Sequence, residues 1–245
     1  MKNMILSGTD YRKLYLLQDK FLSWFHTMEY PFYLTGGTAL GRFYLNHRFS
    51  EDLDFFVNND PHYAAYVGEI KNRITSQFSV NIEQSLFADD YTRLFITEGD
   101  HALKVELIND VPYYAGKPQK YIYGTVDNLL NILANKLTSI VGRDEPKDLF
   151  DIIHLAGTYA FSWPEVFYHA KQKVVINELD VEQRLLSFPV EWFQNVNWLL
   201  APPDLESLRN TVKQIADDFL LGRANSLGEG KTPIERAIPL SESSI

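Results

Sequence analysis

Hydrophobic residues recur with two different periods along this chain, and the period changes near residue 125. Residues 9–28 predict an amphipathic helix that ends before Pro31, because apolar side chains recur at steps of three and four: Leu14, Leu17, Phe21, Trp24, Phe25 and Met28. The segment FYLT (32–35) predicts a short strand. TALGRFYL (38–45), which follows a glycine pair, predicts a second helix.

Three later segments have the composition and alternation of strands: DLDFFV (52–57), YTRLFIT (91–97) and LKVELI (103–108). A helix is predicted around residues 65–77. The order helix, strand, turn-helix, strand, helix, strands is typical of an α+β or α/β domain with a mixed sheet.

From Asp127 onward the pattern is almost entirely helical, with helices predicted at 128–141, 147–156, 164–174, 181–199 (interrupted at Pro189) and 205–221. We therefore predict an α+β fold, with a mixed β-sheet flanked by helices in residues 1–125 and an all-helical part in residues 126–227. Residues 228–245, rich in Gly, Ser and Pro, are expected to form an extended tail.

Composition narrows the classes of function. The 245 residues contain no cysteine, which excludes disulfides, zinc–thiolate sites and cysteine nucleophiles. The charged N-terminus does not resemble a signal peptide, and no segment reaches the roughly 18–20 apolar residues of a membrane span. We expect a cytoplasmic protein with no membrane segment. The net charge of −9 disfavours broad RNA binding, although a local basic patch near Arg48 and Lys136 stays open.

Asp52 and Asp54 share one face of a predicted strand, because side chains alternate and Leu53, Phe55 and Val57 share the other. Two neighbouring carboxylates repel each other unless a cation lies between them. Hard oxygen ligands suit Mg²⁺ or Mn²⁺. The alternative is solvated charge at the end of a strand, and the spacing alone leaves both interpretations open.

The pair Gly36-Gly37 precedes Thr38 at a predicted strand-to-helix turn. Backbone N–H groups and the positive end of a helix can hold a phosphate there, and glycine permits close approach. A plain turn without a ligand is the alternative. Glu106 lies between two apolar residues of LKVELI, so we expect its side chain on the open face of the sheet, as a third acid beside Asp52 and Asp54. The alternative is that this charge protects the edge of a sheet from pairing with another strand.

Lys136 lies in a predicted helix that is apolar on most sides, so its ammonium must reach solvent or meet an anion. Asp148 and Asp151 are neighbours on the next helix. An acid in a first helical turn also favours the helix dipole without any other function. We favour Asp148 over Asp151 as a site residue.

The order strand, glycine pair, helix, Asp-X-Asp strand and acidic strand resembles the nucleotidyltransferase superfamily. Three segments resemble the AbiEii/AbiGii toxin-type nucleotidyltransferases in particular: YLTGGTALGRFYLNHRFSEDLDFF, LKVEL and NILANKLTSIVGRDEPKDLFDIIHL. These motifs cover about 55 residues between positions 33 and 155. The gap of 14 residues between Gly37 and Asp52 is slightly longer than the generic pattern, and the last 85 residues carry no assigned motif.

The resemblance implies a transferase that moves a nucleoside monophosphate from an NTP to an acceptor hydroxyl. Asp52, Asp54 and Glu106 would bind Mg²⁺ or Mn²⁺ and form the catalytic centre, and Glu106 could also act as a general base. The implied nucleotide-binding residues are Gly36, Gly37, Thr38, Arg48, Ser50, Lys136 and Asp148, with the helical part completing the site.

A toxin role, an RNA acceptor such as tRNA and a cognate antitoxin are likewise implied by the resemblance alone. Two other functions stay open: a nucleotidyltransferase for small molecules, as among antibiotic adenylyltransferases, and a nucleotide-binding module without activity.

Overall fold

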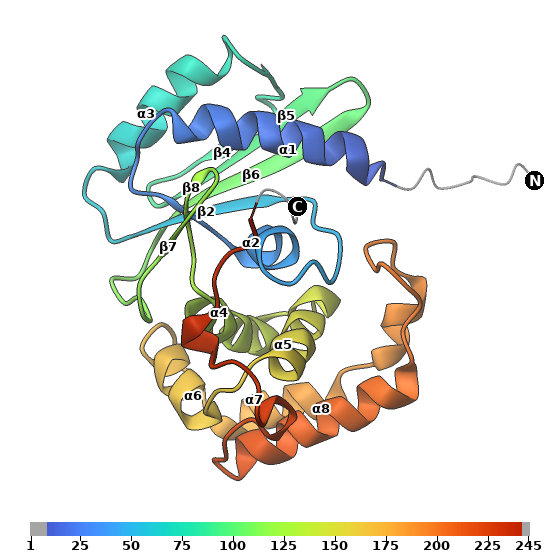
Figure 1. Ribbon diagram of the computed structural model, residues 1–245. Helices are drawn as coiled ribbons and strands as arrows, with labels where there is room; N and C mark the ends of the chain where they lie inside the picture. Colours follow the sequence, from blue (N-terminus) through green and yellow to red (C-terminus); the bar gives the residue numbers. More distant parts are fainter. Residues whose placement is uncertain (1–8, 242–245) are drawn as a thin grey trace, which may run out of the picture.

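The computed structural model describes residues 9–241 (Figure 1). Its helices are α1 (Tyr11–His26), α2 (Gly36–Phe43), α3 (Tyr63–Ile74), α4 (Leu129–Gly142), α5 (Pro146–Thr158), α6 (Trp163–Lys171), α7 (Glu178–Ser187) and α8 (Leu205–Leu220). Its strands are β1 (Tyr33–Thr35), β2 (Leu53–Asn58), β3 (Ser79–Val80), β4 (Leu86–Phe87), β5 (Tyr91–Glu98), β6 (His101–Asp110), β7 (Gln119–Tyr121) and β8 (Gly124–Val126).

The strands form one mixed sheet, as predicted. Its order is β3-β5-β6-β2-β1-β8-β7, with β4 paired to β5. The pairs β2–β6 and β1–β8 are parallel, and the other pairs are antiparallel. Strand β2, which carries Asp54, therefore lies inside the sheet between β6 and β1.

The two faces of β2 differ because its sequence alternates. Leu53, Phe55 and Val57 are buried, and the ring of Phe55 packs on Phe21 and Phe25 of α1. Helix α1 thus covers the apolar face of the sheet, whereas α2 lies between the sheet and the helical part of the chain (Figure 1). The other face of β2 is left open toward that helical part.

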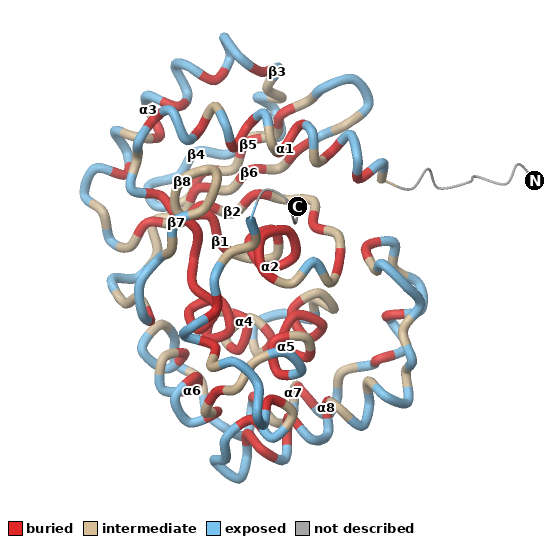
Figure 2. The backbone as a smooth tube through the Cα atoms, in the orientation of Figure 1, coloured by how far each residue is buried: buried red, intermediate tan, exposed pale blue. Residues whose placement is uncertain are grey.

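Helix α4 is the centre of the helical part and contacts α5, α6 and α7. Figure 2 shows α2 and α4 as largely buried segments in the middle of the molecule. Helix α8 begins and ends as its sequence predicts: the Asp204 carboxylate accepts hydrogen bonds from Glu206 N and Ser207 N, and Gly222 follows with φ +61°. The α+β fold with a helical C-terminal part is confirmed.

The interruption predicted at Pro189 is observed, because α7 ends before it, but a 3₁₀-helix at Val190–Asn195 follows in place of the α-helix expected up to residue 199. Strands β3 and β4, which precede β5, and strands β7 and β8, which lie in the segment before Asp127, were not predicted. The boundary proposed at residue 125 falls within β8, and the division into domains stays a prediction.

The C-terminal segment has no long helix or strand, but its described part does not extend freely into solvent. Ile234 and Ala237 are buried, Gln119 Nε2 donates to Ala237 O at 2.7 Å, and Leu240 N donates to Phe43 O at 2.7 Å. Ile234 N also donates to Ala160 O, so this segment contacts both the sheet-containing part and the helical part of the fold. Residues 242–245 of the predicted tail, and residues 1–8 of the N-terminus, lie outside the described residues. In the described chain, no helix has the length and apolar character needed to cross a bilayer.

Candidate active site

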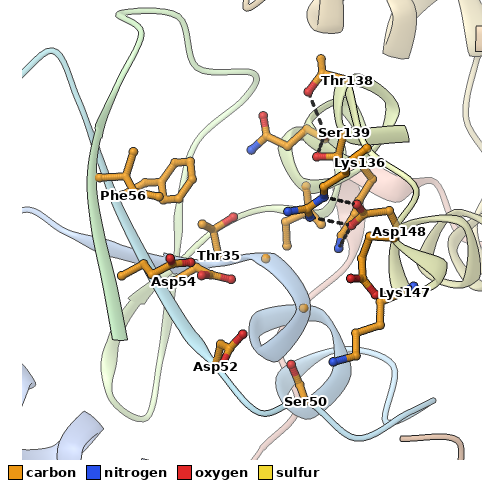
Figure 3. A pocket seen from close by; sticks show the side chains of 18 of the residues that line it. Thr35, Ser50, Asp52, Asp54, Phe56, Lys136, Thr138, Ser139, Lys147 and Asp148 are labelled. Carbon is orange, nitrogen blue, oxygen red and sulfur yellow. Dashed lines mark hydrogen bonds and ion pairs between the residues drawn. The ribbon is translucent and has the colours of Figure 1, made fainter. Parts of the chain in front are cut away.

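Three acidic side chains meet on the open face of β2 and β6. Asp54 and Glu106 are register partners on these parallel strands, so their side chains leave the sheet on the same face and next to each other. Asp52 comes directly before β2. Figure 3 shows Asp52, Asp54 and Phe56 extending toward the helices opposite. The strand alternation predicted for Asp52, Asp54 and Glu106 is observed.

Two further side chains contact these acids. The ammonium of Lys104 lies 2.9 Å from Asp52 Oδ2 and 3.1 Å from Glu106 Oε2. The hydroxyl of Tyr91, on the neighbouring strand β5, donates a hydrogen bond to Glu106 Oε1. Glu106 is therefore held from two sides, and one lysine joins it to Asp52.

The three acids have different proton affinities. Burial, together with the negative charges of Glu106 and Asp52, raises the pKa of Asp54 to about 7. Burial also raises the pKa of Asp52, although Lys104 opposes this. Burial raises the pKa of Glu106 too, but the hydrogen bond from Tyr91 and the charge of Lys104 outweigh it, and the net shift is downward. The ionised form of Asp54 is therefore destabilised, and a cation beside it would favour that form.

The glycine pair makes room for this site. Gly36 has φ +69°, and a Cβ atom there would lie 2.4 Å from Asp54 Oδ2. A Cβ on Gly37 would lie 2.5 Å from an Arg48 guanidinium nitrogen and 3.1 Å from Ser50 Oγ. Helix α2 begins at Gly36, so its N-terminal backbone faces the acids. The glycines therefore let the positive end of a helix approach the carboxylates closely.

The other residues predicted on this turn have different positions. Thr38 is fully buried, and its hydroxyl donates to Asp52 O and is hydrogen-bonded to the Ser50 hydroxyl, so its side chain supports the turn and does not face the cavity. Ser50 lines the cavity. Arg48 also reaches the cavity wall, but its guanidinium is engaged by Asp151, with Nε 2.6 Å from Oδ1.

Helices α4 and α5 form the opposite wall through a buried ion network. Lys136 Nζ lies 2.8 Å from Asp148 Oδ1 and 2.7 Å from Asp151 Oδ2. Arg143 Nε lies 2.7 Å from Asp148 Oδ2. His47 Nε2 lies 2.8 Å from Asp151 Oδ1. The anion that Lys136 meets in this structure is thus a pair of aspartates.

The charges in this wall stabilise one another. Burial alone would raise the pKa of Asp151, but Arg48 and Lys136 outweigh it and hold that pKa well below its ordinary value. Lys136 and Arg143 likewise lower the pKa of Asp148 against the effect of burial. Asp148 lines the cavity, whereas Asp151 has no exposed surface and anchors Arg48. Asp148 is thus the one of the two that lines the cavity, and its role in the site stays a prediction.

A cavity of about 470 Å³ separates the two walls (Figure 3). Its acidic side carries Asp52, Asp54 and Glu106, and its cationic side carries Lys136, Arg143 and Lys147. The remaining lining residues are Thr35, Gly36, Gly37, Arg48, Ser50, Glu51, Phe56, Lys104, Ile108, Asp110, Ile132, Asn135, Thr138, Ser139, Glu145, Asp148, Lys173 and Val174. Except for Thr38, the residues predicted for the site all line this cavity.

Comparison with known proteins agrees with this arrangement. The family model for the nucleotidyl transferase AbiEii toxin of type IV toxin–antitoxin systems matches residues 22–195, which is more than half of the chain. The chain belongs to the AbiEii nucleotidyltransferase family. The matched segment contains both walls of the cavity, so the shared region includes the entire candidate site.

Solved structures are similar in fold. JHP933 from Helicobacter pylori has a TM-score of 0.61 and 21% identity, over 88% of this chain and 94% of that one. A putative nucleotidyltransferase from H. pylori has a TM-score of 0.58 and 20% identity, over 90% and 96%. MenT4, a nucleotidyltransferase toxin from Mycobacterium tuberculosis, has a TM-score of 0.57 and 19% identity, over 86% and 84%. A search of curated proteins finds no match.

The acids of this AbiEii-family protein fit a divalent cation in kind, because three carboxylates converge beside a helix N-terminus. Within residues 9–241, however, no three acidic or imidazole side chains are arranged as a ready metal-binding group. Lys104 lies between two of the acids. The three carboxylates therefore suit a divalent cation by their chemistry, but the ammonium of Lys104 lies between Asp52 and Glu106.

Lys104 and Tyr91 are neighbours of the site that the sequence did not single out. Lys104 precedes Glu106 by two residues and so shares its face of β6, a signal that strand alternation contains. Tyr91 reaches Glu106 because β5 pairs with β6. Arg93 is the register partner of Glu106, and Tyr91 lies two residues before Arg93 on β5. That contact depends on strand register, which the local pattern does not specify.

Proposed function

We propose that this nucleotidyltransferase moves a nucleoside monophosphate from an NTP to an acceptor hydroxyl and releases pyrophosphate, with Mg²⁺ or Mn²⁺ bound. The observation that carries the proposal is one cavity with three convergent acids on one side (Asp52, Asp54 and Glu106) and, on the other, the cationic groups of Lys136, Arg143 and Lys147, each with an acidic partner. A metal–triphosphate complex has the matching distribution of charge.

Each wall has its own task in this proposal. Asp52, Asp54 and Glu106 would hold the divalent cation, which would neutralise charge on the phosphoryl oxygens. The N-terminal backbone of α2 at Gly36 and Gly37 binds phosphate oxygens, since these N–H groups have no partner within the helix.

The remaining cationic and polar groups position the triphosphate. Ser50 lies beside the turn and can donate its hydroxyl to a phosphate. Lys147, which lies 3.4 Å from Glu51, is the cation with the weakest partner on its wall and is free to turn toward phosphate. Lys136, Arg48 and Asp148 set the shape and charge of the wall through their mutual ion pairs.

Glu106 is the group best placed to accept the proton of an acceptor hydroxyl. Its pKa lies below its ordinary value, so it is ionised near neutral pH. Tyr91 fixes the orientation of the carboxylate. Deprotonation of the hydroxyl, attack on the α-phosphorus and departure of pyrophosphate complete the transfer.

We further propose that the acceptor is RNA, with tRNA as the first candidate, and that a cognate antitoxin restrains the enzyme. Membership of a toxin family supports both proposals. NTPs and tRNA occur together in the cytoplasm, which is the compartment that this function requires.

The test uses each of the four α-³²P-labelled NTPs with Mg²⁺ and, in separate reactions, total tRNA, a panel of small hydroxylated molecules, or the protein alone. We expect label on tRNA with the wild type and none with Asp54→Asn. Asp100→Asn, in the exposed turn between β5 and β6, is the matched control and should be as active as the wild type.

The other outcomes separate the alternatives. Label only on a small molecule would replace the RNA acceptor with a small-molecule acceptor. Saturable NTP binding without any transfer would identify an inactive nucleotide-binding module, and absence of NTP binding would contradict the proposed function altogether.

A further inference from the structure

Lys104 is the residue of the acidic wall whose position the transfer chemistry does not explain. Its side chain lies on the same face of β6 as Glu106, two residues away. The ammonium contacts both Asp52 and Glu106, at 2.9 and 3.1 Å. A single cation therefore joins two of the three acids that would hold a metal.

The contacts of Lys104 are incompatible with a divalent cation on the same oxygens. A cation bound between Asp52 and Glu106 would lie a few ångströms from the ammonium, and like charges at such a distance repel strongly. One of the two positive charges must leave. The metal has no covalent link to the chain, whereas the ammonium is tethered by a flexible stem of four methylenes.

Lys104 has room to leave. Its side chain is 28% exposed, in contrast to 9% for the buried Lys136 on the opposite wall. It also lines the cavity, so an ammonium released from the acids can stay within the site. Removal of Lys104 from Asp52 and Glu106 would not require any change in the backbone of the sheet.

We propose that Lys104 is a tethered counter-ion: it holds Asp52 and Glu106 together in the metal-free protein and is displaced when a divalent cation binds. This inference rests on the metal-dependent transfer proposed above. It explains why three convergent carboxylates are present while no ready metal-binding group is found in residues 9–241. Since the cation must displace the ammonium, Lys104 lowers the affinity of the nucleotide-free site for metal.

The experiment measures Mn²⁺ binding without nucleotide, from the electron paramagnetic resonance signal of free Mn²⁺, for the wild type and Lys104→Met. Removing the competing charge should tighten binding by at least about tenfold. Lys120→Met is the matched control, because Lys120 is exposed on β7, far along the chain from the acids, and its ammonium donates to Thr125 Oγ1. Its Mn²⁺ affinity should equal that of the wild type.

Unchanged or weaker Mn²⁺ binding by Lys104→Met overturns the proposal, as does absence of binding by both proteins. Far-ultraviolet circular dichroism confirms that each variant is folded, and Lys104→Gln replaces Lys104→Met if the latter is not. Label transfer by the wild type is measured in parallel. Transfer without the expected change in affinity contradicts only the role of Lys104, whereas a wild type that neither binds Mn²⁺ nor transfers label contradicts the proposed function as well.

Discussion

Lys136 of α4 and Asp151 of α5 form a buried ion pair, with 2.7 Å between Nζ and Oδ2. The same ammonium contacts Asp148, and Asp151 in turn holds Arg48, which comes from the loop before β2. One buried network thus connects the helical wall of the cavity to the segment that leads into the acidic wall. The shape of the active site therefore depends on every charged side chain of this network being present.

The first prediction concerns Lys136. In Lys136→Met a buried cation is lost while Asp148 and Asp151 stay, and breaking a buried ion pair in this way costs about 3–5 kcal/mol. Urea unfolding at pH 7 should show a loss of that size. Lys120→Met, which removes an exposed lysine, should change the free energy of unfolding by less than about 0.5 kcal/mol. Equal stabilities of the two variants would contradict a structural role for the network.

The second prediction is a dependence of stability on pH. The pKa of Asp151 is well below 3.8 in the folded protein, so at acidic pH the unfolded chain binds a proton that the folded protein does not. This contribution to stability is complete above the unfolded pKa of about 3.9 and is lost as pH falls through the folded pKa.

We therefore expect the free energy of unfolding of the wild type to fall steeply below about pH 4. Asp151→Asn should be less stable at pH 7 and should show a shallower decline, measured by urea unfolding between pH 3 and 7. If Asp151→Asn does not fold, Asp148→Asn tests the same relationship, since the pKa of Asp148 is also lowered. Identical slopes in wild type and variant would be evidence against these ion pairs.

The third prediction concerns Gly36. A Cβ atom there would lie 2.4 Å from Asp54 Oδ2, at a backbone φ of +69° that disfavours alanine. Gly36→Ala should displace Asp54 and lower the rate of nucleotidyl transfer about 100-fold, as expected for a displaced catalytic group. In Gly68→Ala, the control in α3, the new Cβ meets no atom within 4 Å, and stability should rise by about 0.5–1 kcal/mol with activity unchanged. A fully active Gly36→Ala would refute the spatial role of this glycine.

The fourth prediction tests the docked C-terminal segment. Ile234 is 1% exposed and Ile238 is 77% exposed, so the two provide a matched pair four residues apart. Ile234→Ala should lower the free energy of unfolding by about 2–5 kcal/mol, whereas Ile238→Ala should have almost no effect. Thermal unfolding of both variants measures the difference. Equal melting temperatures would mean that this segment does not contribute to the folded core.

The sequence predicted the elements whose residues carry a strong local pattern. Leu53, Phe55 and Val57 alternate with Asp54 and Phe56, and this alternation alone determines which face of β2 is open. Asp204 and Gly222 mark the two ends of α8 through local capping chemistry. Motif residues such as Gly36 and Glu106 line the cavity for the same reason, since the motif specifies both residue type and local conformation.

Contacts between distant segments could not be predicted in this way. Asp151 and Arg48 are 103 residues apart, and their pairing depends on how α5 packs beside the loop before β2. The burial of Ile234 likewise depends on how the C-terminal segment packs against the rest of the fold, which no periodic pattern in the local sequence predicts. Lys104 is an intermediate case: its face of β6 follows from alternation, but its contact with Asp52 depends on the register of β2 and β6.

The measurement that tests the central claim most directly is the release of pyrophosphate together with the transfer of label from α-³²P-NTP, with and without Mg²⁺. Wild-type protein should produce both in equal amounts and only with the metal, and Asp54→Asn should produce neither. Equal transfer by Asp54→Asn, or transfer by the wild type in the presence of a metal chelator, would contradict a reaction that depends on the acidic wall of this cavity.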